Sequence, residues 1–262
     1  MQYQGGKARH ARHIAKVIAP RGIWWEPFCG GLSVSARLAQ YGPGIVSDAN
    51  AALIALYRAV RDGWIPPERV TVEEWHAAKL LPDTDPLKAF IGVGCSYAGI
   101  WFSSPDVRYQ RRWLPRDKCW ALDDTAGAAR RALLRDIAVL SETGCRITGP
   151  IDFNKAGSLV PDPAVEVVYC DPPYIGTAGY SGVAGFDHAV FWARCAEIAG
   201  TGRDVYVSEF SGPPEGVGIR VDEVWNRASG CLMAGRGSGL DKRSVNVQPR
   251  MERLYRVIAG AA

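Results

Sequence analysis

Short apolar runs alternate with amphipathic stretches in the first third of the chain. Residues 23–25 are apolar and residues 44–47 are mostly so, which is the pattern of strands buried in a sheet. Residues 8–19, 34–40 and 51–61 carry apolar side chains at helical spacing. This alternation of strand and helix predicts an α/β fold with a largely parallel sheet.

The alternation stops in the middle of the chain and then returns. Three helices are predicted within an insert of residues 63–144, at 73–81, 87–93 and 125–142. Beyond the insert the pattern predicts strands at 146–149, 167–170 and 204–208, a helix at 189–199, and an antiparallel pair formed by 221–225 and 252–258. We therefore predict one α/β unit, made of residues 1–62 and 145–262, interrupted by a largely helical insert.

The strand predicted at 167–170 runs directly into Asp171-Pro172-Pro173-Tyr174. Pro172 cannot donate to a sheet ladder, so the strand must stop there. In open α/β sheets, ligands bind beyond the carboxyl ends of the strands, which is where this tetrapeptide lies.

These four residues suit an exocyclic amine on a planar base. Asp171 and the free carbonyl of Pro172 can accept the two N–H groups, and Tyr174 can stack on the ring. The other interpretation is a strand that ends in a proline turn, with Asp171 as a cap and Tyr174 as a packing residue. An Asp171 side chain turned into the protein interior and salt-bridged there would contradict the first interpretation.

A second candidate site follows the strand at 23–25. Gly30 and Gly31 lie between this strand and the next helix, in the geometry that holds a small ligand against a helix N-terminus. Asp48 ends the next strand, eighteen residues after Gly30, near the spacing at which an acid binds a ribose hydroxyl. A dinucleotide-binding dehydrogenase would need Gly-x-Gly-x-x-Gly here, and the chain does not supply it.

Four motifs occur in a fixed order: Tyr-x-Gly-Gly-Lys from Tyr3, Glu-Pro-Phe-x-Gly from Glu26, Ser-Asp-x-Asn from Ser47, and Asp-Pro-Pro-Tyr from Asp171. This order resembles Dam-like DNA adenine N6-methyltransferases of the D12 class, group alpha, with the nearest likeness to phage-type members. The resemblance implies a Rossmann-like methyltransferase fold with a mixed, mostly parallel seven-stranded sheet. It also implies that residues 1–62 and 145–262 form the S-adenosylmethionine-binding catalytic domain and that the insert recognises the target.

The resemblance also carries a set of site residues. The cofactor-binding residues that it implies are Tyr3, Lys7, Phe28, Gly30, Asp48, Asn50, Asp152, Phe153 and Asp171. Among them, Asp48 would bind the ribose and Lys7 would lie near the methionine end. Asp152 and Phe153 would hold the adenine of the cofactor. The alternative, in which Asp152 is a cap and Phe153 is a core residue, is equally compatible with the sequence. The family often has Phe-x-Gly-x-Gly, and the second glycine stands one place early here.

The insert carries a basic run, 108–118, with five cations against one acid and two aromatic residues between the arginines. Guanidinium groups bind phosphates and stack on bases, so this run predicts DNA contact, although a basic face is more often simply solvated. A glycine-rich loop after Tyr174 and a basic stretch, 227–250, are further candidates. The DNA-binding residues predicted in this way are Arg108, Tyr109, Arg111, Arg112, Tyr180, Lys242 and Arg243.

Composition indicates the general class of protein and its cellular location, and it does not change the predicted fold. The chain has 262 residues, 47% hydrophobic and 22% charged, with a net charge of +4, which is ordinary for a globular protein. Its seven cysteines form no Cys-x-x-Cys pair, which favours reduced thiols and no structural zinc. With no apolar run long enough to cross a bilayer, we expect a cytoplasmic protein of a bacterial or phage-infected cell, with no membrane or metal partner.

The predicted function is transfer of a methyl group from S-adenosylmethionine to the N6 amine of an adenine flipped out of double-stranded DNA. Asp171, Pro172, Pro173 and Tyr174 would be the catalytic residues. Methylation of cytosine N4, of an RNA base or of a protein glutamine stays open, as does an inactive DNA-binding relative. The motifs specify neither the DNA sequence recognised, nor the oligomeric state, nor a partner endonuclease of a restriction–modification system.

Overall fold

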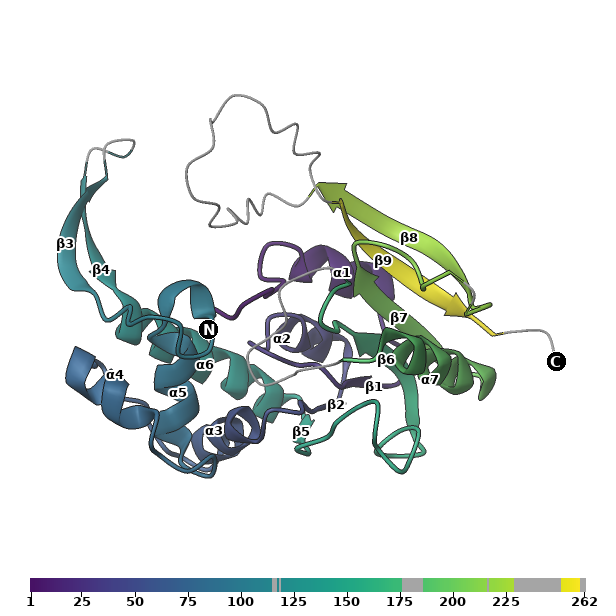
Figure 1. Ribbon diagram of the computed structural model, residues 1–262, viewed down its shortest axis with the longest axis horizontal. Coiled ribbons are helices and arrows are strands. Elements are labelled where there is room, and N and C mark those ends of the chain that lie inside the picture. The colour runs from purple at the N-terminus through teal and green to yellow at the C-terminus, as the bar shows by residue number, and fades with distance from the viewer. Residues whose placement is uncertain (115–116, 118, 176–185, 216, 229–250, 260–262) are drawn as a thin grey trace.

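A computed structural model describes residues 1–114, 117, 119–175, 186–215, 217–228 and 251–259 (Figure 1). The main sheet has seven strands: β1 (Ile23–Glu26), β2 (Gly44–Val46), β5 (Arg146–Ile147), β6 (Val165–Cys170), β7 (Asp204–Glu209), β8 (Arg220–Ala228) and β9 (Met251–Ile258). The α-helices are α1 (Ala11–Ile18), α2 (Ser35–Leu38), α3 (Ala51–Arg61), α4 (Val72–Ala78), α5 (Pro86–Gly94), α6 (Thr125–Glu142) and α7 (His188–Gly200). Two short 3-10 helices, η1 (Ala39–Tyr41) and η2 (Tyr97–Gly99), complete the helical elements.

The strand order in the sheet is β5-β2-β1-β6-β7-β9-β8. Neighbours from β5 to β7 are parallel, and β9 runs antiparallel to both β7 and β8. The predicted Rossmann-like fold with a mixed, mostly parallel seven-stranded sheet is therefore confirmed. The chain moves outward from β1 in one direction and returns to add β6 on the other side, so a topological switch point lies between β1 and β6.

Alternation along the central strands separates two buried layers. Trp24 and Val167 point to one face of the sheet, where α1, α2, α3, α5 and α6 supply apolar side chains. Trp25 and Val168 point to the other face, which α7 covers. Both tryptophans are at most 1% exposed. Strands buried on both faces explain why these runs are continuously apolar rather than alternating.

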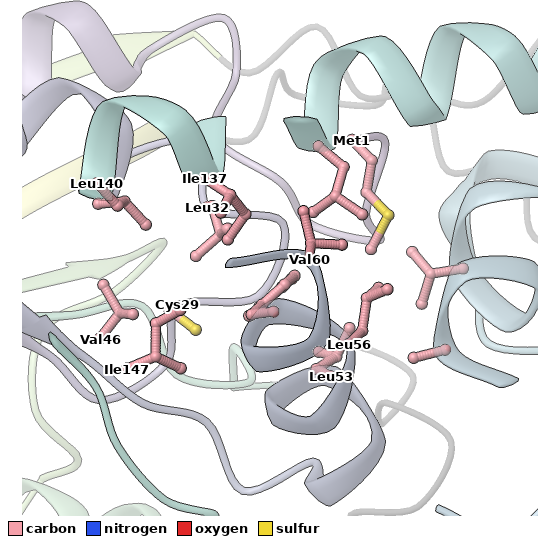
Figure 2. Packing of buried hydrophobic residues seen from close by; sticks show 14 of the residues in the cluster. Met1, Cys29, Leu32, Val46, Leu53, Leu56, Val60, Ile137, Leu140 and Ile147 are labelled. Atoms are coloured by element: carbon pink, nitrogen blue, oxygen red, sulfur yellow. The ribbon is translucent and has the colours of Figure 1, made fainter. Parts of the chain in front are cut away.

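The insert shares the first of these layers rather than forming a core of its own. Leu53 and Leu56 of α3 pack in one cluster with Ile137 and Leu140 of α6, and Met1 joins them (Figure 2). Residues of α5 belong to the same cluster. The insert helices are thus held to the sheet by continuous apolar packing.

The three helices predicted in the insert are present, and α6 has the predicted bounds. The basic run instead forms a two-stranded hairpin of β3 (Tyr109–Leu114) and β4 (Cys119–Asp124), which projects from the body of the molecule (Figure 1). Trp113 and Trp120 face each other across this hairpin with ring centroids 5.6 Å apart. Such a cross-strand aromatic pair stabilises a hairpin that has little other packing.

Candidate active site

One cavity of about 590 Å³ lies at the carboxyl ends of β1, β2 and β6, beside the switch point. This volume is within the range of small-molecule sites. All nine residues predicted from the sequence to bind a cofactor line it: Tyr3, Lys7, Phe28, Gly30, Asp48, Asn50, Asp152, Phe153 and Asp171. The structure thus brings together residues that are up to 168 positions apart in the chain. Their contact with a cofactor stays a prediction.

The turn after β1 is tied to the end of β2 by the carboxylate of Asp48. The backbone N–H of Gly30 donates to Asp48 Oδ2 at 3.0 Å, and that of Asn50 donates to Oδ1 at 2.9 Å. Burial raises the pKa of Asp48, although these two N–H groups act in the opposite sense. A carboxylate has about four acceptor positions, so Asp48 keeps capacity for a hydroxyl in the cavity.

Gly30 leaves the space that makes this turn a cradle. Its φ is +41°, and a Cβ at this position would lie 2.9 Å from the ring of Tyr3. The side chain of Asn50 caps α3, because its Oδ1 accepts from the N–H groups of Ala52 and Leu53. Asn50 therefore has a structural task as well as its place on the cavity wall.

A buried ion pair occupies the reaction end of the cavity. Lys7 Nζ lies 2.7 Å from Asp171 Oδ1 and 3.8 Å from Glu252 Oε1. Burial would lower the pKa of Lys7, but the two carboxylates outweigh burial and raise it. For Asp171, burial raises the pKa and Lys7 opposes the rise.

The salt bridge of Asp171 tests the interpretation of the tetrapeptide. The Asp171 side chain is 16% exposed and lines the cavity, and its partner Lys7 lines the same cavity. The carboxylate is therefore paired, but it is paired within the site and not buried elsewhere in the interior. Its role towards a base stays a prediction.

Tyr174 is placed differently from the open stacking platform that the sequence suggests. Neither Tyr174 nor Pro172 is among the described residues that line the cavity. The Tyr174 hydroxyl donates to Glu252, its ring lies 4.6 Å from that of Phe210, and Lys7 Nζ lies 4.5 Å from its centroid. The reason is that β9 supplies a buried acceptor, and only the folded sheet brings β9 to this point.

Three buried glutamates of the site were missed by the sequence reasoning. Glu26 ends β1 and lines the cavity, and Ser35 Oγ donates to its carboxylate. Glu209 ends β7, 1% exposed, and accepts from the N–H groups of Ile175 at 3.1 Å and Phe210 at 2.7 Å. Glu252 lies in β9. The signal that could have found them is an acid inside or directly after a run of apolar strand residues.

Burial governs the protonation of these glutamates. It raises the pKa of Glu26 well above its ordinary value. It raises the pKa of Glu209 to about 8, against the two backbone N–H groups. The pKa of Glu252 is also raised by burial, with Lys7 acting in the opposite sense.

The other end of the cavity has an aromatic wall. Phe28 packs against Phe153 and Phe186 with ring centroids 5.4 and 5.9 Å apart. Phe153 is 1% exposed and also contacts Trp25, so it is a core residue whose edge borders the cavity. Asp152 is half-exposed and pairs with Lys155 at 2.9 Å.

Comparison with known proteins bears on the N-terminal part of this site. Residues 3–78 match the family described as D12 class N6 adenine-specific DNA methyltransferase. The resemblance to D12 class enzymes is therefore confirmed over that stretch. The stretch contains the glycine turn, Asp48 and Lys7, whereas Asp171 lies outside it. The likeness to phage-type members stays a prediction.

Other comparisons add little to this match. None of the curated proteins compared with the chain matched it. Among the solved structures that match is the rRNA methyltransferase aviRa from Streptomyces viridochromogenes, with 16% sequence identity and a TM-score of 0.41. That alignment covers 98% of this chain and 86% of the other.

The insert contributes to the cavity wall as well as to the hairpin. Asp83 and Lys88 form an ion pair of 2.8 Å at the cavity, and Trp101 also lines it. Carboxylates outnumber cations among the charged residues of the wall. Glu26 is not counted because burial raises its pKa well above the ordinary value. The other five acids are Asp48, Asp83, Asp152, Asp171 and Asp187, and the three cations are Lys7, Lys88 and Lys155. Such a wall favours a ligand that carries positive charge.

The predicted DNA-binding residues of the hairpin are not equivalent. Arg108 pairs with Asp106 at 2.6 Å and with Asp123 at 2.9 Å, so its charge is largely compensated. Arg112 is 62% exposed, with its nearest carboxylate at 3.8 Å. Tyr109 is 49% exposed, and Arg111 lies 6.0 Å from the ring centroid of Trp120.

Three predicted DNA contacts, Tyr180, Lys242 and Arg243, lie outside the described residues. In the part of the chain that the structure describes, no group of three or more His, Cys, Asp or Glu side chains is arranged to hold a metal ion. No helix in the same part is both long and apolar enough to cross a membrane.

Proposed function

We propose that the protein transfers a methyl group from S-adenosylmethionine to the N6 amine of an adenine in double-stranded DNA. The observation that carries this proposal is the position of Asp171. Its carboxylate faces the same cavity as the glycine turn and Asp48, and residues 3–78 match a family of adenine-specific DNA methyltransferases. The sites for a methyl donor and for an amine would then be neighbours.

The cavity fits the donor in size, shape and charge. Its volume of about 590 Å³ suits a small molecule, and the turn that contains Gly30 forms part of its wall. Asp48 has acceptor capacity for a ribose, and Phe28 presents an aromatic face. The excess of carboxylates suits a cationic ligand. When bound, S-adenosylmethionine supplies an electrophilic methyl group on a sulfonium.

The residues of the chain would contribute positioning and electrostatics. Asp171 accepts a hydrogen bond from the N6 amine, and the Pro172 carbonyl accepts the second. These bonds draw the lone pair of the nitrogen out of the ring plane and aim it at the methyl group. Lys7 holds the Asp171 carboxylate in place through their 2.7 Å contact. The base must leave the helix, because a paired amine cannot enter the cavity.

Tyr174 is assigned to stacking on the adenine. Its ring makes a T-shaped contact with Phe210, and Lys7 Nζ lies 4.5 Å from its centroid, so a base would have to stack beside these groups. The exposed cations of the hairpin, Arg111 and Arg112, are assigned to the DNA backbone. Because Arg108 is already paired with two carboxylates, we assign it to the stability of the hairpin in the first place.

The decisive experiment replaces Asp171. We expect Asp171→Ala to abolish transfer of a labelled methyl group to duplex DNA. Removal of one partner of a buried ion pair costs about 3–5 kcal/mol, so the fold must be checked by circular dichroism. Asp171→Asn, which keeps the shape of the side chain, serves as the second variant. Transfer at near wild-type rate by folded Asp171→Ala would refute the proposal, and the rate of Asp171→Asn shows how much of the effect depends on the charge rather than on the acceptor oxygen.

A second experiment tests the substrate. DNA from cells that express the protein should contain N6-methyladenine, detected by sequencing that reads modified bases. DNA from cells that express Asp171→Ala should not. Modified cytosine with unmodified adenine would instead favour the alternative of cytosine methylation.

A further inference from the structure

The N-terminal segment carries an unusual excess of positive charge. Residues 7–21 contain Lys7, Arg9, Arg12, Lys16 and Arg21 together with two histidines, and no acidic residue. The first acid in the chain is Glu26. The proposed function accounts for Lys7 alone. The other cations of this run need a separate explanation.

Helix α1 sorts these residues onto two faces. Ala11, Ile14, Ala15 and Ile18 are buried against the sheet. The remaining polar positions of the helix and of the turn before it are exposed: Arg9, Arg12, His13 and Lys16. We call these four residues, together with the exposed Arg227 of β8, the α1 basic face.

The cations of this face are uncompensated. Within the described residues, Lys7 is the one cation of the run that forms an ion pair. Five of the seven described arginines of the insert differ in this respect, because each pairs with a carboxylate: Arg108, Arg112, Arg130, Arg131 and Arg135. Because this run of fifteen residues contains no acid, its exposed surface stays positively charged and can attract an anionic partner.

Strand β8 extends the same surface. His10 packs against Trp225 with ring centroids 5.5 Å apart, which fixes α1 against this strand. Burial, followed by the positive charges of Arg227 and Lys7, lowers the pKa of His10. Arg227 therefore belongs to the same positive environment as α1, although more than 200 residues separate them in sequence.

The position of the face relates it to the site. Arg9 follows Lys7 by two residues, so their Cα atoms are at most about 7 Å apart. In the view of Figure 1, α1 lies between the projecting β3–β4 hairpin and the β8–β9 pair, and α3 lies on the opposite side of the molecule. The α1 basic face therefore begins beside a residue that lines the cavity.

We propose that the α1 basic face binds phosphates of the DNA duplex next to the flipped base. This inference rests on the proposed function and adds a second DNA-binding surface to the hairpin. Arg12 and Lys16 are one helical turn apart, about 6 Å along the axis, which approximates two phosphate steps of about 3.4 Å on one strand. Binding here would release counterions and anchor the duplex without reading its sequence.

The experiment measures how DNA affinity depends on salt. The probe is a fluorescent duplex oligonucleotide of about 24 base pairs, titrated by anisotropy at several salt concentrations. We compare the wild type with Arg9→Gln/Arg12→Gln. The control is Arg61→Gln, at the end of α3 on the far side, where the arginine pairs with Asp62 at 3.0 Å and is expected to make no DNA contact. For the double variant, each lost phosphate contact should reduce the slope of log K against log[salt] by about 0.9, hence by about 1.8 in all.

We expect the double variant to bind roughly tenfold more weakly at low salt, and the Arg61→Gln control to bind like the wild type. Arg9→Lys/Arg12→Lys keeps both charges and should restore the slope. Calorimetric affinity for S-adenosylmethionine should be the same in all variants, which also shows that each one is folded.

Three results would overturn the inference, and each has a different meaning. If the wild type binds duplex DNA and methylates it while the double variant keeps the wild-type slope and affinity, the α1 basic face is only a solvated surface. If the wild type neither binds duplex DNA nor transfers methyl to it, the proposed function fails as well. If the wild type binds a single-stranded RNA but no duplex DNA, and the double variant loses the same amount of slope with that RNA, the face binds a different partner.

Discussion

A single ammonium group near the N-terminus, that of Lys7, is shared between two carboxylates from the second half of the chain. Asp171 lies 2.7 Å from it and Glu252 lies 3.8 Å from it, and all three side chains are buried or nearly so. The positive charge of Lys7 lowers the cost of burying each carboxylate, and the two carboxylates lower the cost of burying Lys7. The same cluster holds the Tyr174 hydroxyl, so one network orients both ends of the Asp-Pro-Pro-Tyr segment.

Glu252 should therefore act as a positioning residue. Glu252→Gln keeps an acceptor for the Tyr174 hydroxyl but loses the attraction to Lys7, whereas Glu252→Ala loses both. We expect single-turnover methyl transfer to fall in the order wild type, Gln, Ala. The Ala variant should be about 10–100-fold slower, because misplacement by about 1 Å can cost 100-fold.

The control for Glu252 is the binding of S-adenosylmethionine, measured by calorimetry on the same variants. A role confined to positioning the acceptor segment leaves this affinity unchanged. Equal rates for the Gln and Ala variants would show that the hydroxyl contact does not matter.

Glu209 should make the stability of the protein depend on pH. Its pKa is raised by burial from 4.5 to about 8, so between these values the folded state binds one more proton than the unfolded state. The contribution of Glu209 to the stability is then fully present below about pH 4.5 and is lost as the pH rises through about 8. Relative to Glu209→Gln, the wild type should lose up to about 1.4 kcal/mol per pH unit in this window.

Urea unfolding of both proteins between about pH 5.5 and 8.5 measures this difference. The Gln variant imitates the protonated side chain, so its curve should lack the Glu209 contribution. Parallel curves for the two proteins would show that Glu209 is ionised throughout the window.

The turn between β1 and α2 shows how one element depends on its neighbours. Gly30 has a φ of +41° and donates to Asp48, while the ring of Tyr3 packs over it. The Tyr57 hydroxyl donates to the Gly30 carbonyl from α3. The turn thus has the shape of a cradle because three other elements hold it.

Gly30→Ala should disturb both the fold and the cavity. The new Cβ would lie 2.9 Å from the Tyr3 ring, in a backbone region that costs a residue other than glycine about 1–3 kcal/mol. We expect a loss of stability of that size and roughly tenfold weaker binding of S-adenosylmethionine.

Gly157→Ala is the matched control for this substitution. A Cβ at Gly157 would have no heavy atom within 4 Å. Unfolding by denaturant and calorimetric titration should then match the wild type. If Gly30→Ala behaves in the same way as Gly157→Ala, the glycine is not required for the cradle.

The whole molecule has a continuous core on the face of the sheet that α3 covers. Side chains from α3, α5 and α6 join those of β1 and β2 in one cluster, so the insert is packed as part of the body (Figure 2). The insert also contributes Asp83, Lys88 and Trp101 to the cavity. We expect the insert and the sheet to unfold together.

Leu56→Ala tests this cooperativity. Leu56 is 0% exposed, and its truncation should lower the free energy of unfolding by about 2–5 kcal/mol. Transitions followed by far-ultraviolet circular dichroism and by tryptophan fluorescence should coincide in the wild type and in the variant. Separate transitions would show that the insert unfolds as an independent unit.

The sequence alone predicted the α/β class and the order of most elements, and its resemblance to a known family pointed to nine of the residues that line the cavity. Apolar runs of strand length and helical spacing are local features, so α3 and α6 could be placed with their observed bounds. The ends of parallel strands meet at one edge of a sheet, so Gly30, Asp48 and Asp171 could be expected to lie together.

Tertiary structure decided the features that depend on distant partners. The hairpin of residues 109–124 depends on cross-strand pairs, and its arginines differ only because Asp106 and Asp123 reach Arg108. Glu209 and Glu252 join the site because β7 and β9 are neighbours in the sheet. The orientation of Tyr174 follows from Glu252, 78 residues further along the chain. Local pattern carries no information about such contacts, because the residues that make them meet only when the sheet is assembled.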